Sequence, residues 1–188
     1  MKVLAMTLLA ATAPASDSFL REFAETRRFL AGRPTNAQLT PDGKSVLFLR
    51  AAQKDPRQML YELDLATGAT KELLTPESLL KGAAETLSTE EKARLERMRV
   101  TARGFTSYQL TRDGTKVLVV LSGKLYVVER ATGKVTQLAT GEGPAIDPRF
   151  APDGNAVAYV RANDVRLVDL KKNAERPVTK GGSALKPN

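Results

Sequence analysis

Three stretches of the chain share one pattern: TPDGKSVLFLR at residues 40–50, TRDGTKVLVVL at 111–121 and APDGNAVAYVR at 151–161. Each begins with a short polar turn that ends in Asp-Gly and continues as an apolar run. Asp-Gly is typical of tight hairpin turns, because these residues tolerate a positive φ. Runs rich in Val, Leu, Phe and Tyr predict strands. Each stretch therefore predicts a hairpin turn followed by a buried strand.

A second apolar run and a second turn follow each of these stretches. The runs are MLYELDL (59–65), KLYVVER (124–130) and DVRLVDL (164–170), and the turns are ATG (66–68), ATG (131–133) and KKN (171–173). From Asp113 to Asp153 the repeat measures 40 positions, which is the length of one four-stranded propeller blade. The sequence therefore predicts a mainly β fold, a β-propeller of four-stranded antiparallel blades.

About three blades are present, whereas propellers close with roughly four to eight. One blade buries a sheet face against each neighbour, so three blades leave an incomplete ring with exposed edges and faces. We expect the ring to be completed by residues beyond Asn188, and residues 1–188 to be poorly soluble alone.

Two segments carry helical patterns instead. The first is 19–31, with Phe19, Leu20, Phe23 and Leu30 on one face, N-caps among residues 16–18, and Gly32 and Pro34 as its end. The second is a helical insertion at 77–104 between the first and second blades. It contains a capping box at Ser88 and Glu91, a Glu90–Arg94 pair, and Gly104 as its end.

The first fifteen residues resemble a secretory signal peptide. Lys2 is followed by the apolar run VLAMTLLAA (3–11) and by the small-x-small site Ala13-Pro14-Ala15. The run is too short to span a bilayer. We therefore expect export to the periplasm or the medium, with 1–15 as the signal peptide and 16–188 as the propeller portion.

The residue types that are missing exclude several kinds of site. The chain has no His, no Cys and no Trp, and its net charge is +8. Without His or Cys, neither a Ser-His-Asp triad nor a typical zinc site can form within the chain. Its Lys and Arg residues are scattered and its aromatic content is 5%, which argues against nucleic-acid binding. No cofactor is predicted.

Local motifs that could suggest chemistry are better explained as turns and loops. GGSAL at 181–185 lacks the last Gly of a nucleophile elbow, and GEGP at 141–144 lacks the Lys of a phosphate loop. Asp42, Asp113 and Asp153 recur, but each belongs to a hairpin and lacks the further oxygen ligands that Ca²⁺ requires. No catalytic, substrate-binding or metal-ligating residue is predicted.

The order of motifs resembles the start of the propeller of bacterial dipeptidyl peptidase IV, in the prolyl oligopeptidase clan of serine peptidases. The resemblance rests on QLTPDGKSVLFLR (38–50), LYELDLATG (60–68), LSTEEKARLER (87–97), KLYVVE (124–129) and PDGNAVAYV (152–160). It covers nearly all of the chain after residue 15. Its most specific part is the helix between the first two blades, which propellers in general lack.

The resemblance implies an eight-bladed propeller that caps a C-terminal α/β-hydrolase domain, which this chain does not include. The implied activity is release of dipeptides, usually after Pro or Ala, with peptides as substrates and a homodimer as the full-length form. The triad would belong to the hydrolase domain, and a Glu-Glu pair that binds the substrate's amino group would follow Asn188. This chain would then act as scaffold and substrate gate.

One departure from the family leaves substrate preference open. Some members carry an Arg in the hairpin that matches residues 121–124, where this chain has only Lys124, to which no role is assigned. Two alternatives remain. One is a TolB-like periplasmic propeller that binds protein partners, and the other is a different hydrolase of the same clan.

Overall fold

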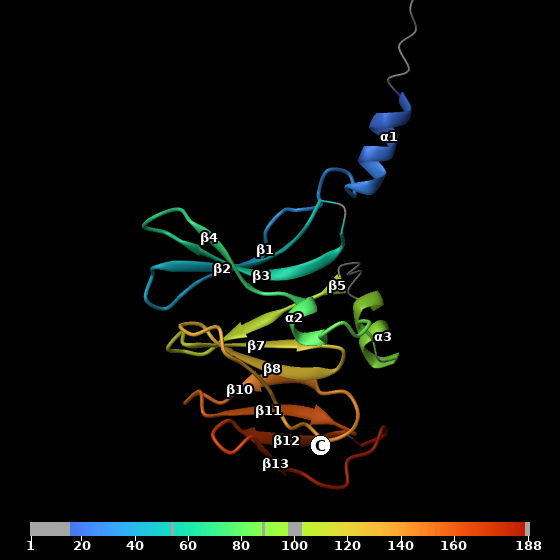
Figure 1. Cartoon of the computed structure of the whole chain (residues 1–188). Coiled ribbons are helices and arrows are strands. Elements are labelled where there is room, and N and C mark those ends of the chain that lie inside the picture. Colours follow the sequence, from blue (N-terminus) through green and yellow to red (C-terminus); the bar gives the residue numbers. More distant parts are fainter. Residues whose placement is uncertain (1–15, 54, 88, 98–102, 187–188) are drawn as a thin grey trace, which may run out of the picture.

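The computed structural model describes residues 16–53, 55–87, 89–97 and 103–186. Its strands form three antiparallel sheets, one for each predicted repeat, stacked along the molecule (Figure 1). Sheet 1 contains β1 (Thr35–Leu39), β2 (Ser45–Ala51), β3 (Arg57–Asp64) and β4 (Thr70–Leu74). Sheet 2 contains β6 (Tyr108–Leu110), β7 (Lys116–Leu121), β8 (Lys124–Glu129) and β9 (Val135–Gln137). Sheet 3 contains β10 (Ile146–Phe150), β11 (Ala156–Arg161), β12 (Asp164–Asp169) and β13 (Ala174–Pro177).

Within each sheet the strands pair in chain order, so every repeat is a four-stranded meander. The prediction of four-stranded antiparallel blades is therefore confirmed. The Asp-Gly turns have a common construction, in which the glycine takes a positive φ of 69° at Gly43, 71° at Gly114 and 68° at Gly154. The aspartate instead uses its side chain: Asp42, for example, accepts the backbone N–H of Lys44 at 3.1 Å.

Sheet 2 is buried on both faces. Successive side chains of β7 point to opposite sides of the sheet, and both sets lie in an apolar core. Val117, Val119 and Leu121 pack toward sheet 1 in one core, and Leu118 packs toward sheet 3 in the other. The first core also includes Leu47, Leu49, Leu60 and Phe105, and the second includes Leu125, Val127, Val157 and Tyr159. The continuous apolar run of the sequence thus reflects a strand that lies between two neighbours.

The helical segments differ from their predicted bounds. The first helix, α1, spans Ser16–Glu25, so it starts earlier than predicted and ends six residues before Ala31. Residues Arg27, Arg28 and Phe29 all take positive φ values, which a helix cannot continue through. Phe19, Phe23 and Phe29 contact one another with ring centroids 5.7–6.1 Å apart. Figure 1 shows α1 projecting from the sheet 1 end of the stack.

The insertion predicted at 77–104 contains two helices and a short strand. Helix α2 spans Pro76–Leu80, and the Thr75 hydroxyl caps it by accepting the N–H of Ser78 at 3.1 Å. Helix α3 spans Thr89–Arg97. Ser88 and the side chains of Glu90, Glu91 and Arg94 lie outside the described residues, so the predicted capping box and ion pair stay predictions.

Gly104 was expected to end the insertion helix, and this prediction is wrong. It lies in β5 (Arg103–Gly104), which pairs in parallel with Arg57 and Gln58 of β3 and extends sheet 1. A Cβ on Gly104 would lie 2.6 Å from the Gln58 carbonyl oxygen. The glycine is therefore required by close contact between two strands rather than by a helix end.

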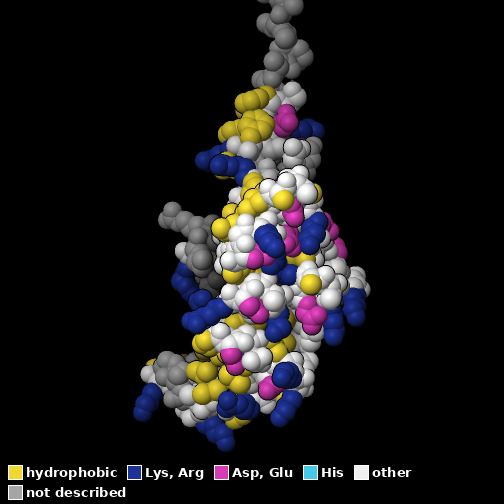
Figure 2. Space-filling model, turned by 90° about the vertical axis from the view of Figure 1, so that its left-hand side faces the viewer, with side chains coloured by type: hydrophobic (Ala, Val, Ile, Leu, Met, Phe, Trp, Pro, Cys, Tyr) yellow, Lys and Arg dark blue, Asp and Glu magenta, His cyan; other side chains and the backbone are white. Residues whose placement is uncertain are grey.

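Basic side chains are spread over one side of the molecule. Figure 2 shows one side of the stack, on which Lys and Arg lie singly or in small groups from sheet 1 to sheet 3, with acidic side chains among them. That the chain binds no nucleic acid stays a prediction. Within the part of the chain that the structure describes, no helix is long and apolar enough to cross a membrane.

Candidate functional site

The first strands of sheets 1 and 3 carry matching irregularities. In β1 the pairing with β2 shifts between Thr35 and Gln38, and in β10 the pairing with β11 shifts between Ile146 and Arg149. The residue in the bulge takes a positive φ in both sheets, 52° at Asn36 and 45° at Asp147. Asn and Asp tolerate this conformation better than other side chains. Bulges of this kind redirect neighbouring side chains.

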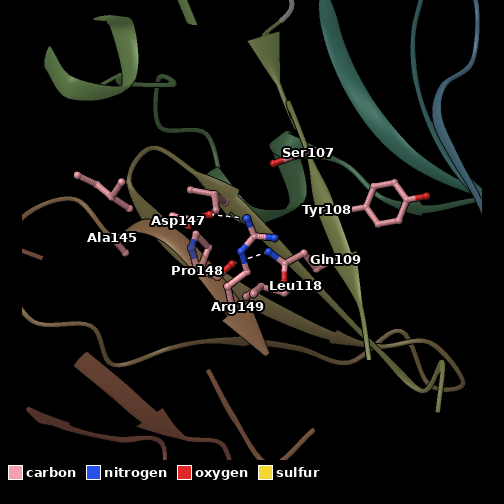
Figure 3. Close-up of a pocket in the computed structure, with 10 residues that line it drawn as sticks. Ser107, Tyr108, Gln109, Leu118, Ala145, Asp147, Pro148 and Arg149 are labelled. Carbon is pink, nitrogen blue, oxygen red and sulfur yellow. Dashed lines mark hydrogen bonds and ion pairs between the residues drawn. The ribbon is translucent and has the colours of Figure 1, made fainter. Parts of the chain in front are cut away.

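A pocket of about 390 Å³ lies beside the second bulge, between the first strands of sheets 2 and 3. Its volume falls within the range of small-molecule sites. Figure 3 shows its labelled side chains, which come from β6, the residue before it and β7 on one side, and from β10 and the residue before it on the other. The lining residues are Ser107, Tyr108, Gln109, Leu118, Val120, Ala145, Ile146, Asp147, Pro148 and Arg149.

The lining of this pocket mixes apolar side chains with polar and charged ones. Arg149 and Asp147 form an ion pair of 2.8 Å, and both side chains are about two thirds exposed, at 66% and 65%. The Gln109 side-chain amide donates a hydrogen bond to the Pro148 carbonyl oxygen, which ties β6 to β10. Because the ion pair is exposed, exchanging one partner for a ligand group costs little. The arrangement can therefore accept a ligand that has both apolar and polar groups.

A second, more open cleft of about 670 Å³ lies at the hairpin between β7 and β8. Its lining includes Ser122, Gly123 and Lys124, together with the loop 137–144. The Ser122 hydroxyl accepts the N–H of Thr86 at 3.1 Å, so this hairpin contacts the insertion. Lys124 is exposed in this cleft. The sequence assigned it no role, and the geometry of the cleft adds none.

The residues singled out in the sequence lie in turns and loops. GEGP at 141–144 lies in the connection from β9 to β10, as expected. Ser183 lies in a loop, where its N–H donates to the Lys186 carbonyl oxygen at 2.9 Å. In the described ranges, no three acidic side chains come together as a metal site would require. That this chain holds no catalytic residue stays a prediction.

The pocket at Asp147 was missed in the sequence. In the sequence, its charged pair stands in the run Ile146-Asp147-Pro148-Arg149, which matches no motif of a binding site. The signal that could have revealed it is a comparison of repeats, because Pro148 stands where the preceding repeat has Tyr108.

The stacked four-stranded sheets with Asp-Gly hairpins define a β-propeller segment. Residues 106–186 match the family described as the dipeptidyl peptidase IV (DPP IV) N-terminal region. The resemblance inferred from the sequence is thereby confirmed, and the region resembles the N-terminal propeller of a dipeptidyl peptidase IV or prolyl peptidase.

Two solved structures share the fold. The crystal structure of Porphyromonas gingivalis dipeptidyl peptidase 4 is 18% identical, with a TM-score of 0.52, over 85% of this chain and 21% of its own. A structure from a study of two prolyl endopeptidases is 15% identical, with a TM-score of 0.56, over 89% of this chain and 25% of its own. The chain therefore spans between a fifth and a quarter of the length of these proteins.

Proposed function

We propose that this chain is the N-terminal propeller segment of an exported serine-type dipeptidyl peptidase, one that releases X-Pro or X-Ala dipeptides from peptide N-termini. The single observation that carries the proposal is the family match at 106–186, which covers all of sheets 2 and 3. The two solved structures support it, because a dipeptidyl peptidase and a prolyl endopeptidase share the stacked sheets.

The proposed mechanism divides the work between two domains. A C-terminal α/β-hydrolase domain supplies Ser, Asp and His, since this chain has no His. A carboxylate pair farther along the propeller binds the ammonium group of the substrate and thereby places the second peptide bond at the nucleophile. Residues 16–186 act as wall and scaffold, and the propeller admits only slender peptide ends. Residues 1–15 direct export, and the full-length protein forms a homodimer.

The proposal is tested by sequencing the reading frame beyond codon 188 and assaying the full-length product. We expect a Glu-Glu pair, further blades and a G-x-S-x-G followed by Asp and His. The purified protein should cleave a chromogenic Gly-Pro amide with a free N-terminus. Its N-acetylated counterpart is the matched control, and it should be cleaved at least about a hundredfold more slowly, because the acetyl group removes the ammonium charge.

The outcomes separate the alternatives. Equal cleavage of both substrates would indicate a prolyl endopeptidase or another hydrolase of the clan. A reading frame that continues with propeller repeats alone would overturn the peptidase proposal in favour of a protein-binding propeller. Export is tested separately, by recovery of the protein in the periplasmic or extracellular fraction and loss of residues 1–15 from its N-terminus.

A further inference from the structure

The bulge in β10 holds an aspartate in a strained backbone conformation, with a φ of 45° at Asp147. The bulge in β1 holds Asn36 at a φ of 52°, and there the side chain joins two sheets. The Asn36 amide donates to the carbonyl oxygen of Thr106, just before β6, at 3.3 Å. Among the described residues Asp147 makes no such bond, and its carboxylate instead contacts Arg149 of the same strand at 2.8 Å (Figure 3). The strain at Asp147 therefore holds a charged pair on the surface.

This pair keeps more binding capacity than the other ion pairs described for the chain. The clusters around Arg57, Glu62 and Glu175 each join three charged side chains. In the described ranges Asp147 and Arg149 pair only with each other, and both side chains are about two thirds exposed. Asp147 has a second carboxylate oxygen and Arg149 has further N–H groups that a ligand can reach. Separating an exposed pair of this kind costs little.

The pair belongs to the lining of the pocket of about 390 Å³ between the first strands of sheets 2 and 3. The same lining contains apolar side chains, among them Leu118, Val120 and Ile146. The hydrogen bond from the Gln109 amide to the Pro148 carbonyl oxygen fixes β10 at the bulge. One acidic group, one basic group and apolar surface therefore share a space of the size that small molecules occupy.

We propose that this pocket binds a free dipeptide. The ammonium group of the ligand binds Asp147, its carboxylate binds Arg149, and its apolar side chains contact Leu118 and Val120. A ligand with both charges gives each member of the separated pair a new partner, whereas a ligand with one charge leaves the other member unpaired. That the ligand is a dipeptide rests on the proposed function, because such molecules are its products. The preference for two opposite charges rests on the pair and the pocket alone.

Saturation-transfer NMR with the full 188-residue chain tests this preference, with the dipeptide Leu-Ala as the probe. N-acetyl-Leu-Ala lacks the ammonium group and Leu-Ala amide lacks the carboxylate, so the two are matched controls. We expect Leu-Ala to bind with a Kd of about 1 mM and each control to bind about fivefold more weakly, which is the contribution of one exposed charge pair. Equal binding of the three molecules, or no binding of Leu-Ala, would overturn the proposal.

Variants of the two charged residues should separate the two contacts. Asp147→Asn should abolish the preference for Leu-Ala over its N-acetyl form and keep the preference over its amide, and Arg149→Gln should do the reverse. Asn also tolerates the positive φ at position 147, so the bulge is retained. Asp55→Asn is the matched control, because Asp55 also pairs with an arginine two positions later, and it should change neither preference. If Asp147→Asn acts no more strongly than Asp55→Asn, Asp147 does not bind the ligand.

A variant that fills the pocket tests where the ligand binds. Ser107 is an exposed lining residue, so Ser107→Trp adds bulk to the pocket without changing the core or either charge. It should weaken Leu-Ala binding at least about fivefold. Ser183→Trp, in an exposed loop, is the control and should leave binding unchanged. If Ser107→Trp binds Leu-Ala as well as the unmodified chain, the pocket is not the site.

The peptidase assay on the full-length protein reports separately on the proposed function. Leu-Ala binding that depends on Asp147 and Arg149, in a protein without peptidase activity, would reject that function and leave the site for a doubly charged ligand standing. Peptidase activity together with Leu-Ala binding that ignores both variants would reject the site and leave the proposed function standing.

Discussion

Asp113 holds together the hairpin between β6 and β7 with its side chain. Its Oδ1 accepts the Thr111 hydroxyl at 2.6 Å, the Thr115 N–H at 3.0 Å and the Thr115 hydroxyl at 2.9 Å. These three donors favour the ionised carboxylate, and they lower the pKa of Asp113 to about 2. The recurrence of Asp at this position in all three repeats thus has a structural explanation that requires no metal.

The lowered pKa of Asp113 makes stability depend on pH. The pKa of this carboxylate is lower in the folded state than in the unfolded state. It therefore contributes its full stabilisation of the folded state above about pH 4, and this contribution is lost as the pH falls toward about 2. Asp113→Asn keeps an oxygen acceptor but cannot titrate. We expect its melting temperature to fall less than that of the unmodified chain between pH 4 and pH 2. Parallel melting curves over this range would contradict the assignment.

Gly104 offers a second test at the scale of one residue. Its φ is 71°, and a Cβ would lie 2.6 Å from the Gln58 carbonyl oxygen and 2.9 Å from a Pro76 side-chain atom. A positive φ alone makes an alanine cost roughly 1 kcal/mol. Because of the added clash, Gly104→Ala should lower the free energy of unfolding by about 3 kcal/mol, measured by chemical denaturation. Gly68→Ala is the matched control, because its φ is 70° and nothing lies within 4 Å of the added Cβ. Equal losses for the two variants would show that the strand contact is unimportant.

The sequence predicts structure well where a residue's role depends on its neighbours in the chain. It predicts poorly where that role depends on residues far away in the chain. The turn at Asp113 follows from neighbouring residues, so the hairpins and strands could be predicted. The role of Gly104 depends on Gln58, 46 positions earlier, and a pattern read along the chain reveals no such contact. The pocket at Pro148 depends on the register between two repeats, which becomes visible only when their strands are aligned in space.

One pair of equivalent positions is charged at the interface between sheets 1 and 2 and apolar at the interface between sheets 2 and 3. Glu62 of β3 lies 6% exposed against sheet 2, where its Oε1 lies 2.5 Å from Arg130 Nη2. Burial alone would raise the pKa of Glu62, but hydrogen bonds from Arg130, Lys71 and Ser45 outweigh it and hold the pKa below its usual range. At the next interface the equivalent positions are Val127 and Leu170. Val127 is part of the second apolar core, and Leu170 packs against that core.

This internal comparison predicts the outcome of a double-mutant cycle. Glu62→Val alone should cost about 3 kcal/mol, because it leaves Arg130 buried without its carboxylate. Adding Arg130→Leu reproduces the pairing found between sheets 2 and 3, and it should recover most of that loss. The free energy of unfolding of the four proteins measures the coupling. If the double variant is as unstable as the sum of the single variants, the two side chains do not act as a pair.

The stack as a whole has two outer faces, of which sheet 3 provides one. On β11 and β12, Val157, Tyr159 and Val168 point toward sheet 2, so the alternate residues point outward. The outward apolar residues are Ala158, Val160, Val165 and Leu167. Each lies 40 positions after a residue of sheet 2 that faces sheet 3, namely Leu118, Val120, Leu125 and Val127. The outer face of sheet 3 is therefore patterned to receive another sheet of the same kind.

When no further sheet covers this face, it should drive self-association of the 188-residue chain, as exposed apolar patches do. Replacing Val160 and Leu167 by Lys adds two charges to the face and should raise the concentration at which the chain associates by about tenfold, measured by sedimentation velocity. Ala66→Lys with Ala131→Lys is the matched control, because it adds the same charge at exposed turns of sheets 1 and 2 and should change association little. If both pairs of lysines reduce association equally, net charge is the cause. If only the first pair does, the outer face of sheet 3 is the contact surface, and in a longer propeller the same substitutions should destabilise the fold because they then lie inside an interface.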